Sequence, residues 1–135
     1  MGKILLVDDE VDILRVLRRY LQDEHEILTA ESARDALRIF AKEKPDVIVT
    51  DIRMPGMTGI EMMRRIKSTA ADAEFIIVTG HGDLETTTTA LELGAADFIL
   101  KPVDIERLRE SISKAINGLK MKDDIINHFQ EFLNK

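Results

Sequence analysis

The stretch Asp46-Val47-Ile48-Val49-Thr50-Asp51, which runs on to Met54-Pro55-Gly56, decides the fold of this chain. A short apolar run that ends in aspartate is typical of a buried parallel strand, whose last side chain emerges at the carboxyl edge of the sheet. The run Ile4-Leu5-Leu6-Val7 has the same form and leads into Asp8-Asp9-Glu10. Open α/β sheets bind their ligands at this edge, so both acidic groups are candidate functional residues.

The rest of the chain alternates short apolar runs with longer segments of helical period. We expect strands at residues 3–7, 26–30, 47–51, 75–78 and 98–100, with a helix after each. This alternation predicts an α/β fold with a five-stranded parallel sheet covered by helices on both faces. Ser32 and Thr58 are the expected N-caps of the second and third helices. The run Thr86-Thr87-Thr88-Thr89 makes the fourth helix intrinsically weak, because β-branched residues are poor helix formers.

An amphipathic segment follows Gly118 at the end of the chain. An apolar stripe with one polar member steps by four and three residues, through Leu108, Ile112, Ala115, Leu119, Lys122, Ile126, Phe129 and Leu133. This spacing permits one long helix, whereas a glycine costs about 1 kcal/mol in a helix interior and often marks the helix end. We therefore divide the chain into a domain at residues 1–117 and a C-terminal extension or linker helix at residues 118–135.

Composition limits the class of protein. The 135 residues are enough for one domain with its own core, and the absence of cysteine excludes disulfides and a thiolate nucleophile. The formal net charge of −6 and the single Tyr disfavour direct binding of nucleic acid. No stretch has the roughly 20 apolar residues of a membrane span, and no signal peptide is recognisable. We therefore expect a cytoplasmic protein without a membrane partner.

The two acidic groups converge if the first and third strands are neighbours in the sheet. At about 4 Å and an effective dielectric constant near 20, Asp8, Asp9 and Asp51 would repel one another by about 4 kcal/mol per pair. Such a site either keeps a proton on a carboxylate or binds a divalent cation. Its oxygens suit Mg²⁺, with Mn²⁺ as the alternative ion. No histidine cluster competes, because the three histidines are scattered and are interpreted as surface or loop residues: His25, His81 and His128.

The same edge of the sheet offers groups that bind a phosphoryl group. Thr79 follows the fourth expected strand, and Lys101 follows the fifth. Asp51 stands alone on its strand, whereas Asp8 and Asp9 are adjacent and better placed to hold a metal ion. Asp51 is therefore the expected nucleophile, which would form an aspartyl-phosphate. Lys101 would neutralise phosphoryl oxygens, and Thr79 would hydrogen-bond one of them.

Five motifs, in this order, resemble the receiver domain of two-component response regulators over residues 3–117. They are Asp8-Asp9-Glu10, Asp51 with Met54-Pro55-Gly56-Met57-Thr58-Gly59, Val78-Thr79-Gly80, Gly94-Ala95-Ala96-Asp97-Phe98, and Lys101-Pro102. The resemblance implies a flavodoxin-like, doubly wound (βα)5 fold and phosphorylation of Asp51 by a histidine kinase or a small phosphodonor. It also implies Mg²⁺ held by Asp9, Asp51 and the backbone carbonyl of Arg53, with Asp8 acting through a water molecule. The Lys101-Pro102 peptide bond is expected to be cis.

A conformational switch is implied by the same resemblance. Thr79 would move toward the phosphoryl group, and the ring of Phe98 would turn inward and change the face formed by the fourth helix, fifth strand and fifth helix. Many receivers have Tyr where this chain has Phe98; a plain core role is the alternative for this ring. Arg53 and His81 occupy positions that flank the attacking water. We hypothesise that they tune the lifetime of the phosphoryl group, with solvent-facing loop residues as the alternative.

We therefore predict a phosphorylation-dependent signalling switch that is not an enzyme. The alternative is a Mg²⁺-dependent phosphohydrolase for small phosphate esters. Such enzymes commonly have a second Asp two residues after the nucleophile, where this chain has Arg53. A degenerate receiver that works without phosphorylation is disfavoured, because the acceptor, metal and lysine positions are all filled.

Three alternatives remain open for the tail. It is a helix packed on the domain, the start of a coiled-coil linker to an output domain, or a dimerisation segment. The stretch Thr79-Gly80-His81-Gly82-Asp83 resembles receivers of the nitrogen-regulation type, whose linker helices dimerise, and this favours the second and third alternatives. The expected partners are a histidine kinase or phosphotransfer protein, an unidentified output domain or effector, and a second copy of the chain.

Overall fold

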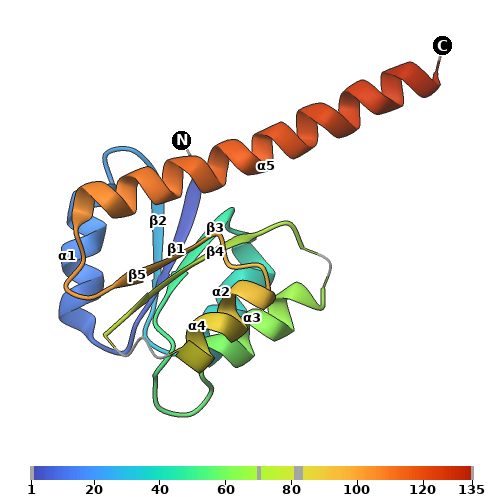
Figure 1. Cartoon of the computed structure of the whole chain (residues 1–135). Helices are drawn as coiled ribbons and strands as arrows, with labels where there is room; N and C mark the ends of the chain where they lie inside the picture. Colours follow the sequence, from blue (N-terminus) through green and yellow to red (C-terminus); the bar gives the residue numbers. More distant parts are fainter. Residues whose placement is uncertain (1, 70, 81–83, 135) are drawn as a thin grey trace.

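The computed structural model describes residues 2–69, 71–80 and 84–134, which form five strands and five helices in strict alternation (Figure 1). The strands are β1 (Lys3–Val7), β2 (Glu26–Ala30), β3 (Val47–Thr50), β4 (Glu74–Thr79) and β5 (Asp97–Leu100). The helices are α1 (Val11–Leu21), α2 (Ala33–Glu43), α3 (Gly59–Lys67), α4 (Leu84–Glu92) and α5 (Ile105–Leu133). The predicted α/β alternation is confirmed.

All five strands lie in one parallel sheet with the order β2-β1-β3-β4-β5. This is the flavodoxin-like order, in which the direction of winding reverses between β1 and β3. Val7 at the end of β1 pairs with Thr50 at the end of β3. The residues that follow these two strands therefore emerge side by side at the carboxyl edge.

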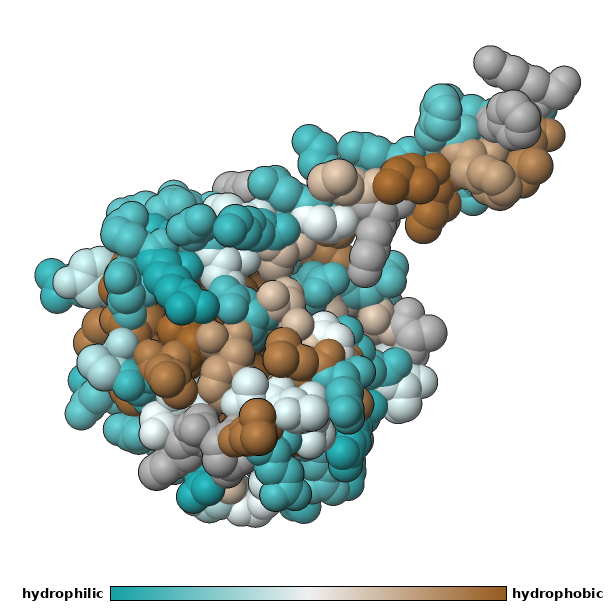
Figure 2. Space-filling view, viewed as in Figure 1, coloured by the Kyte–Doolittle hydropathy of each residue, from teal (hydrophilic) through white to brown (hydrophobic). Residues whose placement is uncertain are grey.

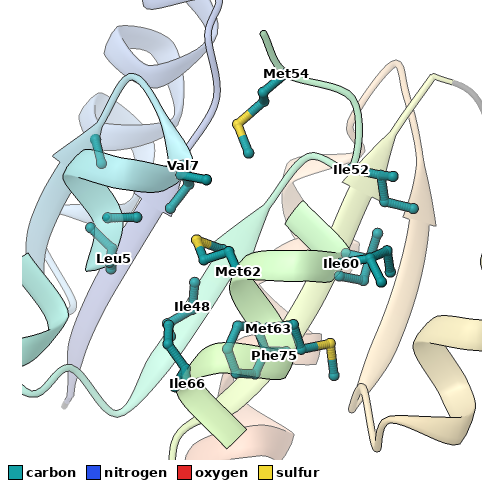
Figure 3. Packing of buried hydrophobic residues seen from close by; sticks show 14 of the residues in the cluster. Leu5, Val7, Ile48, Ile52, Met54, Ile60, Met62, Met63, Ile66 and Phe75 are labelled. Carbon is teal, nitrogen blue, oxygen red and sulfur yellow. The ribbon is translucent and has the colours of Figure 1, made fainter. Parts of the chain in front are cut away.

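The sheet has a hydrophobic core on each face, because successive strand side chains point to opposite sides. Leu5, Ile48 and Phe75 pack against α2, α3 and α4 in one cluster, where Met62, Met63 and Ile66 of α3 cover the sheet (Figure 3). The other cluster holds Ile4, Val49 and Ile76 beneath α1 and α5. Burial on both faces explains why the strands read as continuous apolar runs rather than as alternating ones.

Helices α2, α3 and α4 lie on the lower face of the sheet in Figure 1, and two of them begin at side-chain N-caps. The Ser32 hydroxyl accepts a hydrogen bond from the Asp35 N–H at 3.1 Å, and the Thr58 hydroxyl accepts one from the Glu61 N–H at 3.2 Å. Both predicted N-caps are confirmed. The Thr-rich α4 buries only Ala90 among its residues and leaves Leu84 84% exposed, so it has little packing to add to its weak intrinsic propensity.

One continuous helix, α5, runs through Gly118 to Leu133. Its first half is held on the sheet by buried Leu108, Ile112 and Ala115. A methyl group at Gly118 would meet nothing within 4 Å beyond the helix's own nearby backbone, so this position has room for a side chain. The second half projects away from the sheet (Figure 1). The alternative in which the tail packs on the domain is therefore not observed.

None of the described helices combines the length and the apolar composition that a membrane crossing needs. Even the long helix α5 carries charged residues throughout its length.

Candidate functional site

The site begins where β1 and β3 end. The Asp51 N–H donates to the carbonyl oxygen of Val7 at 3.1 Å, and the Asp8 N–H donates to that of Ala30 at 3.2 Å. The strand β3 ends at Thr50, and Asp51 is the first residue beyond it. The two hydrogen bonds continue the pairing of the strands by one residue. The backbones of both aspartates are thereby fixed. Both residues are buried, with 6% of Asp51 and 5% of Asp8 exposed.

Three carboxylates meet at this edge, as predicted. One oxygen each from Asp8, Asp9 and Asp51 lies within 4.8 Å of the others, and Asp9 is exposed at the rim. Hard oxygen donors at this spacing fit Mg²⁺ or Mn²⁺, which prefer carboxylates and retain several waters. The exposed position of Asp9 leaves the group open to solvent on one side.

The Lys101 ammonium lies between two of the carboxylates. Its Nζ is 2.9 Å from Oδ2 of Asp8, 2.8 Å from Oδ2 of Asp51 and 3.8 Å from Oε1 of Glu10. We expected either a retained proton or a bound cation to relieve the repulsion of the acids. The structure shows that a side chain of the protein itself supplies a positive charge at this point.

Burial and pairing shift the pKa values of this cluster in opposite directions. Burial raises the pKa of Asp8, and hydrogen bonds from the Glu10 N–H and from Lys101 offset part of that rise. Burial alone would lower the pKa of Lys101, but its hydrogen bonds to Asp51 and Asp8 outweigh burial and raise it. Lys101 therefore stays a cation over the whole physiological range.

Backbone amides hold the Asp51 carboxylate in one orientation. Its Oδ1 accepts from the Ile52 N–H at 2.6 Å and more weakly from the Arg53 N–H at 3.4 Å, while Oδ2 faces Lys101. The Thr50 hydroxyl donates to the Asp51 carbonyl oxygen at 2.9 Å. Both carboxylate oxygens are thus positioned by donors, which defines the direction in which they face.

Gly59 is a site residue to which the sequence motif alone assigned no role. A Cβ atom at this position would overlap the Asp51 carbonyl oxygen and lie 3.1 Å from the carbonyl carbon. The Gly59 N–H also donates to the Ile52 carbonyl oxygen at 2.9 Å, which closes the loop after Asp51. The signal was available, because Gly59 directly follows the N-cap Thr58 at the start of a helix.

The remaining predicted residues lie at different distances from this centre. Thr79 is fully buried at the end of β4, where its carbonyl oxygen accepts from the Lys101 N–H at 2.9 Å. The Lys101-Pro102 bond is cis, as expected. Phe98 is half-buried in β5 and packs against the α2–α3–α4 cluster rather than joining the carboxylates. His81 lies outside the described residues.

A second polar cluster, which the sequence did not reveal, ties β5 to α5. Asp97 accepts from the Ser111 hydroxyl at 2.8 Å, from Arg107 at 3.1 Å and from the Phe98 N–H at 2.7 Å. Burial would raise the pKa of Asp97, but these donors outweigh burial and lower it. Asp97 therefore fixes the backbone beside Phe98 to the first turns of α5.

Comparison with known proteins identifies the family. The sequence model of the family described as response regulator receiver domain matches residues 4–113 of this chain. This chain belongs to that family. The receiver domain resembles DNA-binding transcriptional regulator NtrC of Proteus hauseri at 38% identity, over 85% of this chain and 24% of that protein. Sporulation initiation phosphotransferase F of Bacillus subtilis is 36% identical, over 83% of this chain and 91% of that protein.

A solved structure supports the same assignment. The crystal structure of a response regulator receiver domain protein from Clostridium thermocellum is 40% identical and superposes with a TM-score of 0.85, over 90% of this chain and 98% of that one. The receiver domain spans 28% and 29% of the length of the first two curated regulatory proteins that it matches. The predicted family and the kinship with regulators of the nitrogen-regulation type are confirmed.

Proposed function

We propose that this receiver domain is a signalling switch in which Asp51 accepts a phosphoryl group. The observation that carries the proposal is the buried Asp51 carboxylate, with the Lys101 ammonium 2.8 Å away and two further carboxylates alongside. A carboxylate of this kind has a nucleophilic oxygen, a neighbouring cation for phosphoryl oxygens and hard donors for a metal ion.

The transfer step is a displacement at phosphorus. One oxygen of Asp51 forms a bond to the phosphorus of a phosphohistidine or an acyl phosphate, and the bond to the imidazole nitrogen or acyl oxygen breaks. The product is an aspartyl-phosphate, which water later cleaves to regenerate the carboxylate and release inorganic phosphate. Lys101 moves from pairing with the carboxylate to pairing with the new phosphoryl oxygens. Hydrogen bonds to Asp51 and Asp8 raise the pKa of Lys101, so it is charged when the transfer begins.

We infer that Mg²⁺ is the resident ion, with Mn²⁺ as a substitute. Asp9, Asp51 and the Arg53 carbonyl would be its ligands, and Asp8 would act through water. The ion would supply positive charge to the transferring phosphoryl group. Asp8 and Asp51 also contact Lys101, so an ion held by Asp51 directly and by Asp8 through water would share these two carboxylates with the ammonium.

The conformational change would be transmitted from Thr79 to the face formed by α4, β5 and α5. Thr79 ends the strand beside β5, and a hollow of about 500 Å³ lies on this face between Thr87, Phe98, Leu100 and Arg107. Leu100 is 58% exposed there, and α4 has little burial to hold it. A shift of Thr79 and Phe98 would reshape this hollow, which we assign to an output domain or effector.

A second groove fits the phosphodonor protein. It measures about 370 Å³ and runs between α1 and the loop after Lys101, lined by Ile13, Val16, Leu17, Pro102, Val103 and Ile105. Its walls are mainly apolar, and Lys101 lies at its edge. An amphipathic helix of a histidine kinase or phosphotransfer protein would dock here with its phosphohistidine directed at Asp51. A relative of similar length is named as a sporulation phosphotransferase.

Mass spectrometry tests this function directly. Incubation with acetyl phosphate and Mg²⁺ should add one phosphoryl group to the wild type and none to Asp51→Asn. The matched control is Asp124→Asn, an exposed acid on the projecting helix, which should be phosphorylated like the wild type. Labelling of Asp51→Asn at another residue would overturn the assignment. Repeated turnover of an aryl phosphate by the wild type would favour the phosphohydrolase instead.

The lifetime of the phosphoryl group is a separate part of the proposal. Arg53 is exposed two residues beyond Asp51, in a position to influence the approach of water, and His81 is assigned the same role from the sequence. Arg53→Ala and His81→Ala should each change the rate of autodephosphorylation. Unchanged rates in both variants would contradict this role while leaving the acceptor assignment intact.

A further inference from the structure

The two edges of the sheet differ in surface character. Apolar residues gather over the β5 edge, as the brown patches in Figure 2 show, and Leu100 of β5 is 58% exposed. The other edge strand is β2, where a hollow of about 550 Å³ lies between α1 and α2. Its lining includes three arginines, Arg15 and Arg18 of α1 and Arg38 of α2. A larger hollow, of about 690 Å³ beside Leu119, has mainly apolar walls, so the arginines distinguish the hollow at β2.

The strand β2 has backbone groups that face away from the sheet. It pairs with β1 alone, toward which the Glu26 N–H donates and the Ala30 carbonyl oxygen accepts. Successive residues of a strand direct their N–H and C=O groups to opposite sides, so those of Ile27 and Thr29 point to the open edge. The Ile27 carbonyl oxygen accepts a hydrogen bond from the Arg18 guanidinium at 3.1 Å. No strand of the described part of the chain pairs with Thr29 on its outer side, and Thr29 lines the hollow.

The arginines of the hollow outnumber its acids. Arg38 is paired with an acid on its own helix, three residues away. Arg15 lies 3.8 Å from Asp12, too far for a hydrogen bond, and both side chains are largely exposed, so this pair is weak. Within the described residues, Arg18 has no carboxylate within ion-pair distance. Arg15 and Arg18 therefore offer two positive charges that only the exposed Glu31 opposes in the lining of the hollow.

We propose that this hollow binds an extended acidic segment of a partner protein. The segment lies along β2 as an added strand and exchanges backbone hydrogen bonds with Thr29. Its carboxylates pair with Arg15 and Arg18, because planar guanidinium groups suit bidentate contacts with carboxylates. The bond from Arg18 to Ile27 holds one guanidinium at the edge in advance. It also fills the acceptor that a longer ladder would need, so the added strand ends there.

A second copy of the chain is a poorer occupant of this edge. Pairing of β2 with β2 about a two-fold axis would bring the arginines of both copies close to one another, and like charges destabilise a strand pair. The hollow is also separate from the groove assigned to the phosphodonor, which is lined by Ile13 and Val16 on the opposite side of α1. An acidic segment at β2 therefore leaves the approach to Asp51 open, and the inference does not rest on phosphorylation.

A synthetic peptide tests the contribution of charge. The probe is fluorescein-labelled Glu-Val-Glu-Val-Glu-Val, and its binding is measured by fluorescence anisotropy at low salt without Mg²⁺ or a phosphodonor. Arg18→Gln should weaken binding at least about tenfold. The control Arg19→Gln, an exposed arginine on the same helix outside the hollow, should change it less than about twofold. Absence of binding, or equal losses in the two variants, would overturn the proposal. If circular dichroism shows that Arg18→Gln is unfolded, a peptide with Gln in place of Glu makes the same test on the wild type.

A second peptide tests the added strand. With Pro in place of each Val, the charges stay but the N–H groups that pair with an edge strand are lost, so binding should weaken at least about tenfold. Nuclear magnetic resonance should also show that the first peptide shifts the amide signals of Ile27 and Thr29. Equal binding of the two peptides would overturn strand addition. Shifts confined to Ile13 and Val16 would place the peptide in the phosphodonor groove and overturn the site, and shifts that follow protein concentration alone would show pairing of two copies instead.

Discussion

The Lys101 ammonium lies 2.8 Å from Oδ2 of Asp51, although 50 positions separate the two residues in the chain. The same ammonium is 2.9 Å from Asp8, so one cation pairs with two buried carboxylates. The charge that would later hold the phosphoryl group therefore also contributes to the stability of the resting domain. This double role leads to the first prediction.

Replacing Lys101 by Ala should destabilise the domain by about 2 kcal/mol, because Asp8 and Asp51 are left buried beside each other without a counter-charge. Added Mg²⁺ should restore more stability to the variant than it gives the wild type. Chemical denaturation with and without millimolar Mg²⁺ measures both effects. Lys114→Ala is the control, since its ion pair with Glu110 is exposed and should change stability by less than about 0.5 kcal/mol. An equal loss in both variants would contradict the role of Lys101.

Gly59→Ala should destabilise the domain by about 3 kcal/mol or abolish folding, because the new methyl group overlaps the Asp51 carbonyl oxygen. Gly118→Ala is a matched substitution that should stabilise the domain. Its methyl group meets nothing within 4 Å beyond the helix's own nearby backbone, and the helix continues through it, so the free energy of unfolding should rise by about 0.5 to 1 kcal/mol. Urea unfolding of the two variants would refute this account if they shifted in the same direction.

Stability should fall as the pH drops below about 6.5, the ordinary pKa of histidine. Burial lowers the pKa of His25, and its Nδ1 accepts a hydrogen bond from the Gly2 N–H at 3.1 Å. The unfolded chain therefore takes up a proton at this residue before the folded one does, and protonation favours unfolding. The loss begins at the unfolded pKa and continues down to the lowered folded pKa.

Urea unfolding between pH 7.5 and 5 measures this dependence. His25→Gln should flatten the acid side of the profile. His128→Gln, on the exposed part of α5, should leave the profile as in the wild type. A steep acid loss that persists in His25→Gln would assign the effect to other groups.

Thr79→Val should separate phosphorylation from switching. The substitution keeps the volume of the buried side chain and removes the hydroxyl that we assign to the phosphoryl group. Asp51 should still be phosphorylated, but the amide signals of α4, β5 and α5 should shift less on addition of beryllofluoride. Nuclear magnetic resonance spectra of the wild type, Thr79→Val and the exposed control Thr88→Val provide the comparison. Full shifts in Thr79→Val would remove Thr79 from the switch.

Much of the fold could be predicted because its signals are local. Apolar runs mark the strands, and Ser32 and Thr58 mark two helix starts through contacts three residues away. The strand expected at residues 47–51 ends at Thr50 in the structure, because a strand end depends on whether a partner strand continues beside it. Gly118 gave conflicting local signals: its intrinsic cost opposes a helix, while the apolar stripe on both sides favours one.

The sequence by itself determined which chemical groups end the strands, and therefore the acidic cluster, the expected acceptor Asp51 and the family. Tertiary structure alone decided that Lys101 pairs with Asp8 across 93 positions, that Gly59 must pass the Asp51 carbonyl, and that a hollow forms beside Leu119. The physical reason is the range of the interactions. Strand and cap preferences act within a few residues, whereas these contacts arise only when the order β2-β1-β3-β4-β5 brings distant segments to the same edge.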